Sequence, residues 1–334
     1  MKLAISDAVW QGYSGRLRAA LTTDWVMSCP NAEALAREVA DADALIGTAL
    51  PDDARRSARR LKLFQYPGAG AQHVKAADLP TGCVLTNVYE HEAPIAEYVL
   101  AVILLQTTRL VRSWSAFRTG RWEGNGRTGG ETHDELLGKT LGLVGYGRIG
   151  QAVAARARAF GMRLLAVRQA AGAPHPYGGP APDFIGGPGD LVFVLGESDF
   201  LVIACPLSDS TRSMIGPAQL AKIRRGAMLI NVSRAEIIEE QPLFDALREG
   251  RLAAAALDVW YQYPTSPDEV MHGSRLPFHE LPNVIVTPHL SAWTDAMIAR
   301  RIRRVAENLD RLASGRPMEN VLLMGTWTPS GYSS

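Results

Sequence analysis

The chain has 334 residues, a length that suits two domains of ordinary size, each with its own hydrophobic core. Its 35 Lys and Arg residues balance 34 Asp and Glu residues, and the net charge of +1 argues against a nucleic-acid partner or an anionic membrane surface. No run of 18 apolar residues occurs, so we predict no membrane-spanning helix. Cys29, Cys83 and Cys205 lie far apart and show no spacing typical of a metal site or a disulfide framework. We therefore expect a cytoplasmic protein without a metal site.

In the first hundred residues, short apolar segments alternate with segments of helical pattern. This alternation predicts a parallel α/β sheet. A basic run at 55–60 and another at 300–304 lie in helical patterns, and we expect both to be solvated helix faces. The predicted strands are 3–9, 44–47, 61–66 and 84–87, and the predicted helices are 32–40 and 51–60.

The segment 94–117 predicts one long helix that joins two domains. Pro94 suits a first helical turn, and apolar residues lie around most of the circumference of the segment. Gly120 follows the predicted end. Such a helix should be buried.

A second α/β series begins after Gly138 and suits a doubly wound, nucleotide-binding sheet. Within it, the Pro- and Gly-rich segment 170–189 is a longer loop than usual, and loops of this length are more often functional than structural. The helix 294–312 follows the series and should pack back on the first domain, so that the chain crosses twice between domains. The predicted strands of the series are 141–144, 164–167, 200–203, 228–231, 254–257 and 284–286.

A glycine-rich turn joins the first strand of this series to an Ala-rich helix. Gly145 permits the tight turn, Gly147 lets a pyrophosphate approach the backbone, and Gly150 allows the helix to pack closely on the strand. The first helical residues, Arg148 and Ile149, direct their free N–H groups at the phosphate. In this context the pattern predicts a dinucleotide site.

Three polar segments follow later strands of the series, at the sheet edge where ligands of open α/β sheets bind. Arg234 can hold a carboxylate with its planar fork of donors, and His289 can move one proton near neutral pH. Each also has an ordinary structural explanation: Arg234 as a surface helix cap, His289 as a hydrogen-bonded core residue, and Asp258 as a strand-end cap.

In this order and spacing the segments resemble the D-isomer-specific 2-hydroxyacid dehydrogenase family. The similarity rests on residues 137–150, 231–234, 258–259 and 287–289, and it covers nearly the whole chain. The resemblance implies an α/β fold of two Rossmann-like, doubly wound parallel-sheet domains with a cleft between them. A discontinuous substrate domain would comprise 1–99 and 292–334, and a dinucleotide-binding domain would comprise 100–291. It also implies a homodimer formed through the cofactor domains.

The resemblance further assigns roles to single residues. Arg234 would bind the carboxylate of a 2-oxo or 2-hydroxy acid, His289 would be the acid or base, and the N–H groups of Ala69 and Gly70 would hold the carboxylate from the other side. Trp293 would help to line the substrate site. Further contacts to the cofactor would come from Cys205, Pro206, Val232, Ser233, Arg234, Asp258, His289 and Ser291.

Arg168 departs from the family pattern. Relatives carry an acidic residue after the second strand, where it accepts the adenosine ribose hydroxyls, whereas here Arg168 follows the strand 164–167. A cation at this position suits a 2′-phosphate, so NADP(H) is favoured, with NAD(H) as the alternative. Arg168 can instead stack on the adenine and leave both cofactors acceptable.

Tyr263 is the second departure. The glutamate that partners the catalytic histidine in the family falls here on Tyr263. A phenol cannot supply the negative charge that raises the pKa of a histidine, but it can orient the ring by a hydrogen bond. We therefore predict a catalytic set of Arg234, His289 and Tyr263 in which the pKa of His289 is lower than in glutamate-bearing relatives.

Two other functions stay open. Formate dehydrogenases have a similar segment around Asp258-Val259-Trp260 and a neutral residue where Tyr263 stands, and their reaction needs no proton transfer. The asparagine that they carry before an Ala-Glu pair corresponds here to His91, which disfavours formate. A catalytically weak, NAD(P)-sensing binding protein would keep the glycine-rich turn but would not need Arg234 or His289.

Overall fold

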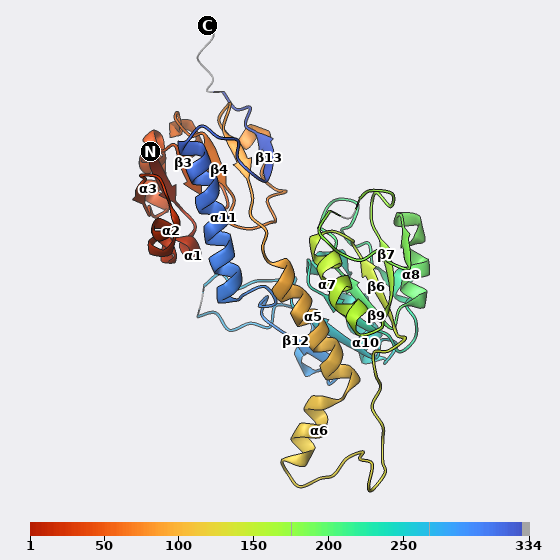
Figure 1. Ribbon diagram of the computed structural model, residues 1–334. Helices are drawn as coiled ribbons and strands as arrows, with labels where there is room; N and C mark the ends of the chain where they lie inside the picture. The colour runs from red at the N-terminus through yellow and green to blue at the C-terminus, as the bar shows by residue number, and fades with distance from the viewer. Residues whose placement is uncertain (175, 267, 329–334) are drawn as a thin grey trace. The chain divides into compact units, whose positions relative to one another are not determined.

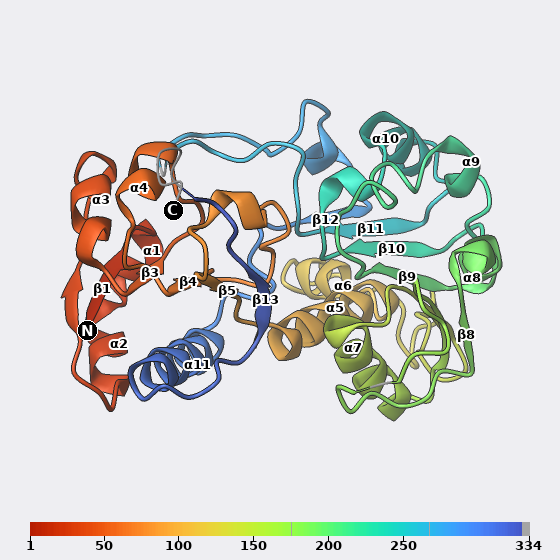
Figure 2. The same ribbon diagram turned by 90° about the horizontal axis from the view of Figure 1, so that it is seen from above.

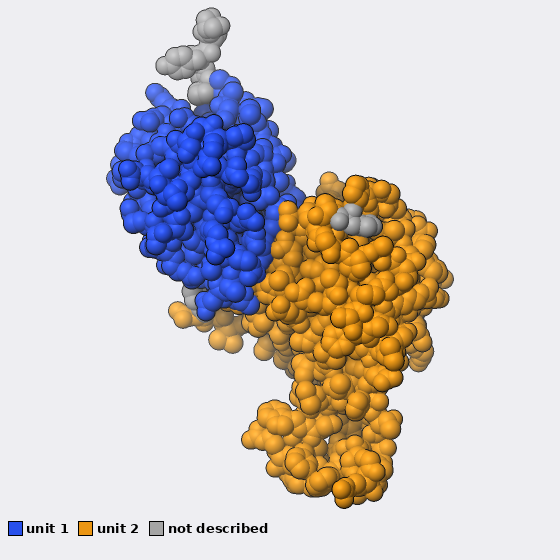
Figure 3. All heavy atoms as spheres, in the orientation of Figure 1, with its two compact units in different colours: residues 1–90, 294–334 blue, residues 91–293 orange. Residues whose placement is uncertain are grey.

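The computed structural model describes residues 1–174, 176–266 and 268–328. The chain divides into two compact units, unit 1 with Met1–Glu90 and Thr294–Ser334 and unit 2 with His91–Trp293 (Figure 3). Each unit is built on its own mainly parallel sheet, with helices packed against it (Figures 1 and 2). The predicted α/β class with two sheets is confirmed, while the division into substrate and cofactor domains stays a prediction.

Unit 1 has a six-stranded sheet in the order β13-β5-β4-β3-β1-β2. The first five strands of the chain run parallel, and β13 pairs antiparallel to β5 at the edge. Neither β2 nor β13 is predicted from the sequence. The predicted strand 3–9 ends early, at Ile5, because a helix begins at Ala8. The strands are β1 (Lys2–Ile5), β2 (Val26–Ser28), β3 (Ala44–Ile46), β4 (Leu63–Gln65), β5 (Val84–Thr86) and β13 (Val321–Met324).

Helix α11 anchors the last part of the chain in unit 1, as predicted. Its apolar face, including Ile302 and Leu309, packs with Leu3 and Leu17 in one buried cluster, because the helix is strongly amphipathic. The helices are α1 (Ala8–Gly12), α2 (Ser14–Ala20), α3 (Ala32–Glu38), α4 (Asp52–Ser57) and α11 (Asp295–Ala313), with 3-10 turns η1 (Val39–Asp41) and η2 (Ala76–Asp78).

The basic run at 300–304 is not a wholly solvated face, and that expectation was wrong. Arg300 and Arg304 both form ion pairs with Glu90, at 3.3 and 3.1 Å. Arg301 donates to the carbonyl oxygen of Tyr89 at 2.8 Å. The run therefore holds the end of the segment from which the chain leaves unit 1.

Unit 2 has a seven-stranded, fully parallel sheet in the order β12-β11-β10-β9-β6-β7-β8. The order reverses between β6 and β9, which is the topological switch point where such sheets bind ligands. All six predicted strands are present, and β8 is an addition inside the predicted loop 170–189. The strands are β6 (Thr140–Val144), β7 (Arg163–Val167), β8 (Phe184–Gly186), β9 (Phe200–Ile203), β10 (Met228–Asn231), β11 (Ala254–Leu257) and β12 (Val284–Val286).

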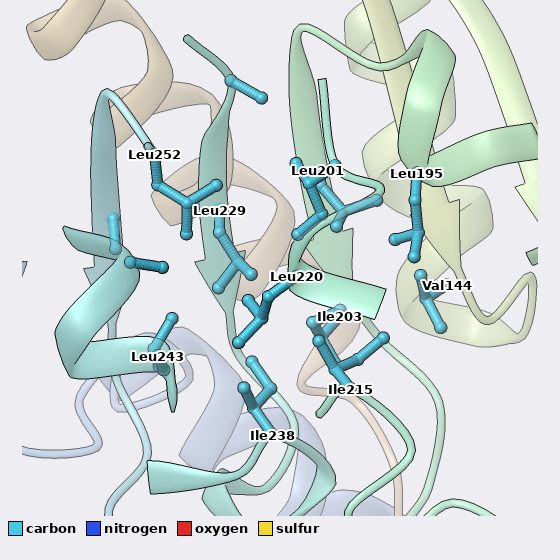
Figure 4. Packing of buried hydrophobic residues seen from close by; sticks show 14 of the residues in the cluster. Val144, Leu195, Leu201, Ile203, Ile215, Leu220, Leu229, Ile238, Leu243 and Leu252 are labelled. Atoms are coloured by element: carbon cyan, nitrogen blue, oxygen red, sulfur yellow. The ribbon is translucent and has the colours of Figure 1, made fainter. Parts of the chain in front are cut away.

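Apolar side chains cover both faces of this sheet. On one face Ile203 and Leu229 pack against Leu243 of a covering helix (Figure 4). On the other, Leu143 packs in one cluster with Val99 and Val153 from two helices. The helices of unit 2 are α5 (Glu92–Thr107), α6 (Leu110–Phe117), α7 (Arg148–Ala159), α8 (Leu191–Glu197), α9 (Pro217–Leu220) and α10 (Glu240–Arg248), with 3-10 turns η3 (Pro188–Asp190), η4 (Ala235–Ile237) and η5 (Phe278–Glu280).

The prediction of a single long helix at 94–117 was wrong, because this part of the chain forms two helices, α5 and α6. Arg109 adopts a left-handed conformation with φ of 52°, which ends a helix. The hydroxyls of Thr107 and Thr108 bond back to carbonyls one turn earlier, at 2.8 and 2.7 Å. Among the described residues no single helix is long and apolar enough to cross a membrane, and α5 and α6 pass that test only as a bent pair, by length and composition alone.

Candidate functional site

The glycine-rich turn leaves the N-terminus of α7 open. Gly145 has φ of 107°, and a Cβ there would lie 2.5 Å from the backbone nitrogen of Cys205. A Cβ on Gly150 would lie 2.3 Å from the carbonyl oxygen of Gly145, so the fold itself requires both glycines. At Gly147, by contrast, a Cβ would have no atom within 4 Å, and none of the described side chains caps the helix. The first N–H groups of α7 are therefore available to an anion.

A pocket of about 950 Å³ lies beside this turn, at the ends of β6, β7 and β9. Five of the predicted cofactor residues line it: Gly145, Gly147, Arg168, Cys205 and Pro206. Burial raises the pKa of the Cys205 thiol to about 11, so this residue stays a neutral thiol at pH 7. The size of the pocket, the open helix terminus and the glycine turn together fit a dinucleotide.

The guanidinium of Arg168 is held in the pocket wall by the loop that follows it. It donates to the carbonyl oxygens of Ala171 at 3.0 Å and Pro174 at 3.2 Å, and also to that of Ala173. Its Nε is buried without a hydrogen-bond partner in the described structure. Arg168 is thus a fixed cation with one donor still unused.

Gln151 is a residue that the sequence analysis missed. Its Oε1 accepts from the backbone nitrogens of Tyr177 at 3.1 Å and Gly179 at 3.4 Å, and its Nε2 donates to the carbonyl of Tyr146. Gln151 therefore ties the loop after β7 to the start of α7. A polar residue on an Ala-rich helix was the available signal, because buried polar groups need partners.

Arg148 and Ile149 lie in the first turn of α7, but neither is among the residues that line the pocket. The Arg148 guanidinium lies 4.3 Å from the ring centre of Tyr177 and 3.6 Å from a carboxylate oxygen of Glu92. Ile149 packs against the core. What these two residues offer a cofactor is their backbone N–H groups.

The turn after β10 fixes the position of Arg234. The Asn231 side chain accepts from Ser233 N at 3.1 Å and donates to Arg234 O at 3.0 Å. The hydroxyl of Ser233 donates to Cys205 O, and Val232 is buried. Arg234 is exposed, and its Nη1 donates to Ser233 O at 2.7 Å. Most of its guanidinium donors remain free for a ligand.

Asp258 does more than cap a strand, because its buried carboxylate organises the segment that carries His289. Its Oδ1 accepts from the Thr287 hydroxyl at 2.6 Å and from Leu290 N at 2.8 Å, and its Oδ2 accepts from Ser291 N at 3.0 Å. His289 has φ of 57°, an uncommon conformation for a residue with a side chain. The three hydrogen bonds hold the segment in that conformation.

Tyr263 contacts His289. Its hydroxyl lies 2.9 Å from Nδ1 of the imidazole. Desolvation lowers the pKa of His289, a neighbouring Asp258 opposes the shift, and Arg234 adds to it. His289 is nonetheless an exposed residue and not a core histidine, so its imidazole is partly desolvated rather than enclosed. Arg234, Tyr263 and His289 therefore share one region of unit 2.

Ala69 and Gly70 lie in unit 1, in the segment after β4. Both are partly buried, and within the described structure neither backbone N–H has a hydrogen-bond partner. Trp293 ends unit 2, and 56% of its surface is exposed. The substrate-binding role of these three residues stays a prediction. Among the described residues, no group of three or more His, Cys, Asp or Glu is placed to hold a metal ion.

Known proteins share this chain's sequence and fold. The family model described as "D-isomer specific 2-hydroxyacid dehydrogenase, NAD binding domain" matches residues 100–291. That match covers more than half of the chain. The chain belongs to the D-isomer specific 2-hydroxyacid dehydrogenase family. The recognition made from the sequence is confirmed, and the chain is an oxidoreductase with a nicotinamide cofactor.

Individual relatives extend the similarity over most of the chain. A glyoxylate reductase of Korarchaeum cryptofilum is 30% identical over 88% of this chain and 86% of its own length. A hydroxypyruvate reductase of Thermotoga maritima is 32% identical over 80% and 83%. A D-3-phosphoglycerate dehydrogenase of Methanocaldococcus jannaschii is 31% identical over 87% of this chain, which spans only 54% of that longer relative.

Two solved structures have the same fold. A family member from Aeromonas salmonicida has a TM-score of 0.78 at 26% identity, over 96% of this chain and 98% of that one. A second, from Xanthobacter autotrophicus, was solved in complex with NADPH and MES and has a TM-score of 0.75 at 25% identity, over 96% and 97%. The family, the fold and the nicotinamide cofactor follow from these similarities.

Proposed function

We propose that the protein is an NADP(H)-preferring reductase of 2-oxo acids, with Arg234 and His289 at the reacting centre. The observation that carries the proposal is that Arg234 and His289 follow the parallel strands β10 and β12 at the same sheet edge of unit 2 that carries the open turn at Gly147. An arginine fork beside a histidine suits a substrate with a carboxylate next to a carbonyl. A protein that only sensed the cofactor would have no use for this pair.

Each residue then has one task. Arg234 binds the substrate carboxylate and polarises the C2 carbonyl. The bound cofactor supplies a hydride to C2. His289 provides the proton that the C2 oxygen takes up. The open N-terminus of α7 binds the pyrophosphate through backbone N–H groups.

The preference for NADP(H) rests on Arg168. The guanidinium is fixed at the pocket wall, where its positive charge attracts a 2′-phosphate. A neutral ribose hydroxyl is attracted to the same guanidinium much less strongly. Stacking of Arg168 on the adenine would instead serve both cofactors equally.

Initial rates over a panel of 2-oxo acids, with NADPH and NADH separately, test the proposal. We expect turnover with several 2-oxo acids and a higher specificity constant with NADPH. Formate with either oxidised cofactor is the companion assay for the formate-dehydrogenase alternative. Turnover of formate without turnover of any 2-oxo acid would overturn the proposal.

Arg234→Lys probes the carboxylate clamp, because a lysine keeps the charge but loses the planar fork. We expect the specificity constant for 2-oxo acids to fall at least about tenfold, or about 1.4 kcal/mol. The matched control is Arg225→Lys, at an exposed arginine of the same unit. Equal activity of the two variants would mean that the carboxylate is held elsewhere.

We also propose that the protein is a cytoplasmic homodimer. None of the residues of α6 is buried, and Leu110, Val111, Trp114 and Phe117 on it are all more than half exposed. A second copy of this chain would cover them, since the family resemblance implies a dimer through the cofactor domains. The three free cysteines suit a reducing compartment. Light scattering should give about twice the chain mass of 36.2 kDa, and a monomer would contradict the dimer.

A further inference from the structure

The hydroxyl of Tyr263 makes two hydrogen bonds in the described structure, one with the backbone of Trp260 and one with the imidazole of His289. The backbone nitrogen of Trp260 lies 3.2 Å from the hydroxyl oxygen, and Nδ1 of His289 lies 2.9 Å from it. A backbone N–H can only donate, so the hydroxyl oxygen accepts from Trp260. The hydroxyl proton is then free for Nδ1.

The chemistry of the two groups points the same way. A phenol is a stronger hydrogen-bond donor than a neutral imidazole N–H, and an imidazole nitrogen is the stronger acceptor. The N–H of Trp260 further polarises the phenol. If Nδ1 accepts, a neutral imidazole carries its proton on Nε2. A glutamate partner would require the opposite tautomer, with the proton on Nδ1.

Burial leaves both rings neutral near pH 7. Burial raises the pKa of Tyr263, and Arg234 opposes this shift while Asp258 and Glu236 add to it. The pKa of His289 is shifted down, chiefly by desolvation. The phenol and the imidazole therefore meet as a neutral pair rather than as an ion pair.

Hydrogen bonds hold the backbone segments that carry the two rings. The three hydrogen bonds to Asp258 hold the backbone on both sides of His289. The indole Nε1 of Trp260 donates to Thr287 O at 2.8 Å, and Tyr98 shares a hydrogen bond of 2.8 Å with the Thr287 hydroxyl. These bonds connect the segment of Tyr263 to the segment of His289 and keep the two rings next to each other.

We propose that Tyr263 and His289 form a proton relay, in which His289 gives its Nε2 proton to the substrate while Nδ1 takes the phenolic proton of Tyr263. The relay rests on the proposed reduction of 2-oxo acids. It replaces the imidazolium of a histidine–glutamate pair with a neutral imidazole backed by a phenol. Tyr263 acts through His289 and does not itself touch the substrate.

The step balances in atoms and charge. When C2 accepts the hydride, the electron pair of the C2–oxygen π bond moves to the oxygen, which bonds to the Nε2 proton. The Nε2–H bond breaks as Nδ1 gains the proton from the phenolic O–H bond, so His289 ends neutral with its proton on Nδ1. The negative charge that began on the C2 oxygen ends on the phenolate, which solvent reprotonates.

The relay has a pH signature. Reduction needs the phenol protonated, so its rate stays level through neutral pH and falls only as pH rises through the pKa of Tyr263, which burial raises. Oxidation of the hydroxy acid needs the phenolate, so its rate rises with pH over the same range. The pair therefore favours reduction at neutral pH. A histidine–glutamate pair would instead lose reduction as pH rises through the pKa of its imidazolium.

The tautomer of His289 can be measured without any turnover. The protein has seven histidines, and 15N labelling of histidine with two-bond proton–nitrogen correlations distinguishes the two neutral tautomers. His289→Gln assigns the signal. We expect the Nε2–H tautomer at about pH 8 in the wild type and loss of that preference in Tyr263→Phe. A Nδ1–H tautomer in the wild type would overturn the relay.

The kinetic arm compares the wild type with Tyr263→Phe and Tyr263→Glu. The wild-type reduction rate should be level from about pH 6 to about pH 9, and it should fall through that range in Tyr263→Glu. Tyr263→Phe should lower kcat at least about tenfold with little change in KM, and its rate should follow the pKa of His289. If Tyr263 had only a structural role, its replacement would change the rate by the same factor at every pH.

The outcomes separate the relay from the proposed function. A wild-type reduction rate that falls through neutral pH, with Tyr263→Phe unimpaired, overturns the relay and leaves the function standing. No reduction of any 2-oxo acid by the wild type overturns the proposed function, and the relay fails with it.

Discussion

The first strand-to-helix turns of the two units differ in whether a side chain caps the N-terminus of the helix. In unit 1, β1 is followed by Asp7, whose carboxylate accepts from the backbone nitrogen of Trp10 at 3.0 Å and so caps α1. In unit 2, β6 is followed by Gly147, and no described side chain caps α7. One helix terminus is already paired with its own carboxylate, and the other is open to an anion.

The comparison shows how one architecture carries two roles. Both units have a parallel sheet with helices packed against it, so the fold alone does not say which one binds a dinucleotide. The turn does. A capped terminus followed by the five-residue α1 offers a phosphate neither free N–H groups nor a long helix dipole, whereas α7 has twelve residues behind an open terminus.

Gly147→Asp would give unit 2 the turn of unit 1. The new carboxylate can cap α7, and its charge repels a pyrophosphate at the same place. We expect affinity for NADPH to fall at least about 100-fold, or about 2.7 kcal/mol, as measured by titration calorimetry. The control is Gly15→Asp in α2 of unit 1, which adds the same charge at a glycine whose Cβ position has no atom within 4 Å. Retained affinity in Gly147→Asp would break the comparison.

Gly150→Ala tests the packing of the same turn. Its Cβ would press on the carbonyl oxygen of Gly145, with no flexible atom to give way. We expect the free energy of unfolding to drop by about 2 kcal/mol in chemical denaturation. Gly15→Ala in α2 of unit 1 is the matched helical control, because no atom lies within 4 Å of its Cβ position. Similar stabilities of the two variants would show that the turn of unit 2 relaxes easily.

Arg168→Ala tests whether Arg168 in the pocket of unit 2 sets the preference for NADPH. The variant loses the cation for a 2′-phosphate and also the anchor of the following loop, so affinity for both cofactors can fall. The informative quantity is the ratio of the two dissociation constants. We expect the preference for NADPH over NADH to shrink about tenfold. An equal loss for both cofactors would favour stacking on the adenine instead.

Asp7→Ala is the smallest expected effect and belongs to unit 1. Removing the cap of α1 should lower the free energy of unfolding by about 1 kcal/mol, and Asp7→Asn, which can still accept from Trp10, should lose less. Neither change should alter the affinity for NADPH. A large loss of cofactor affinity in Asp7→Ala would mean that unit 1 takes part in the dinucleotide site.

The sequence predicts the buried strands better than the edges and breaks. The six strands of unit 2 that were expected are apolar runs, and five of them end at or are followed by a polar or glycine residue, which is a strong signal. Edge strands such as β2, β8 and β13 are three or four residues long and depend on a partner strand for their definition. The break at Arg109 has no Gly or Pro to mark it, so only the backbone reveals it.

In the candidate site, too, the sequence predicts some features and misses others. Their positions after strands whose ends meet at one sheet edge made Arg234 and His289 candidates, and the family resemblance assigned their roles. The contact of Tyr263 with His289 was expected only through the family resemblance. No pattern indicated that Asp258 would hold the segment around His289 or that Gln151 would tie down the loop after β7, because those roles depend on hydrogen bonds between distant parts of the chain.

Hydrogen exchange with and without NADPH tests the contrast between the two turns most directly, because it reports on both in one protein. We predict that NADPH slows exchange in peptides covering 144–151 of unit 2 and leaves peptides covering 5–11 of unit 1 unchanged. Protection at 5–11, or none at 144–151, would contradict the assignment of the dinucleotide to the open turn of unit 2.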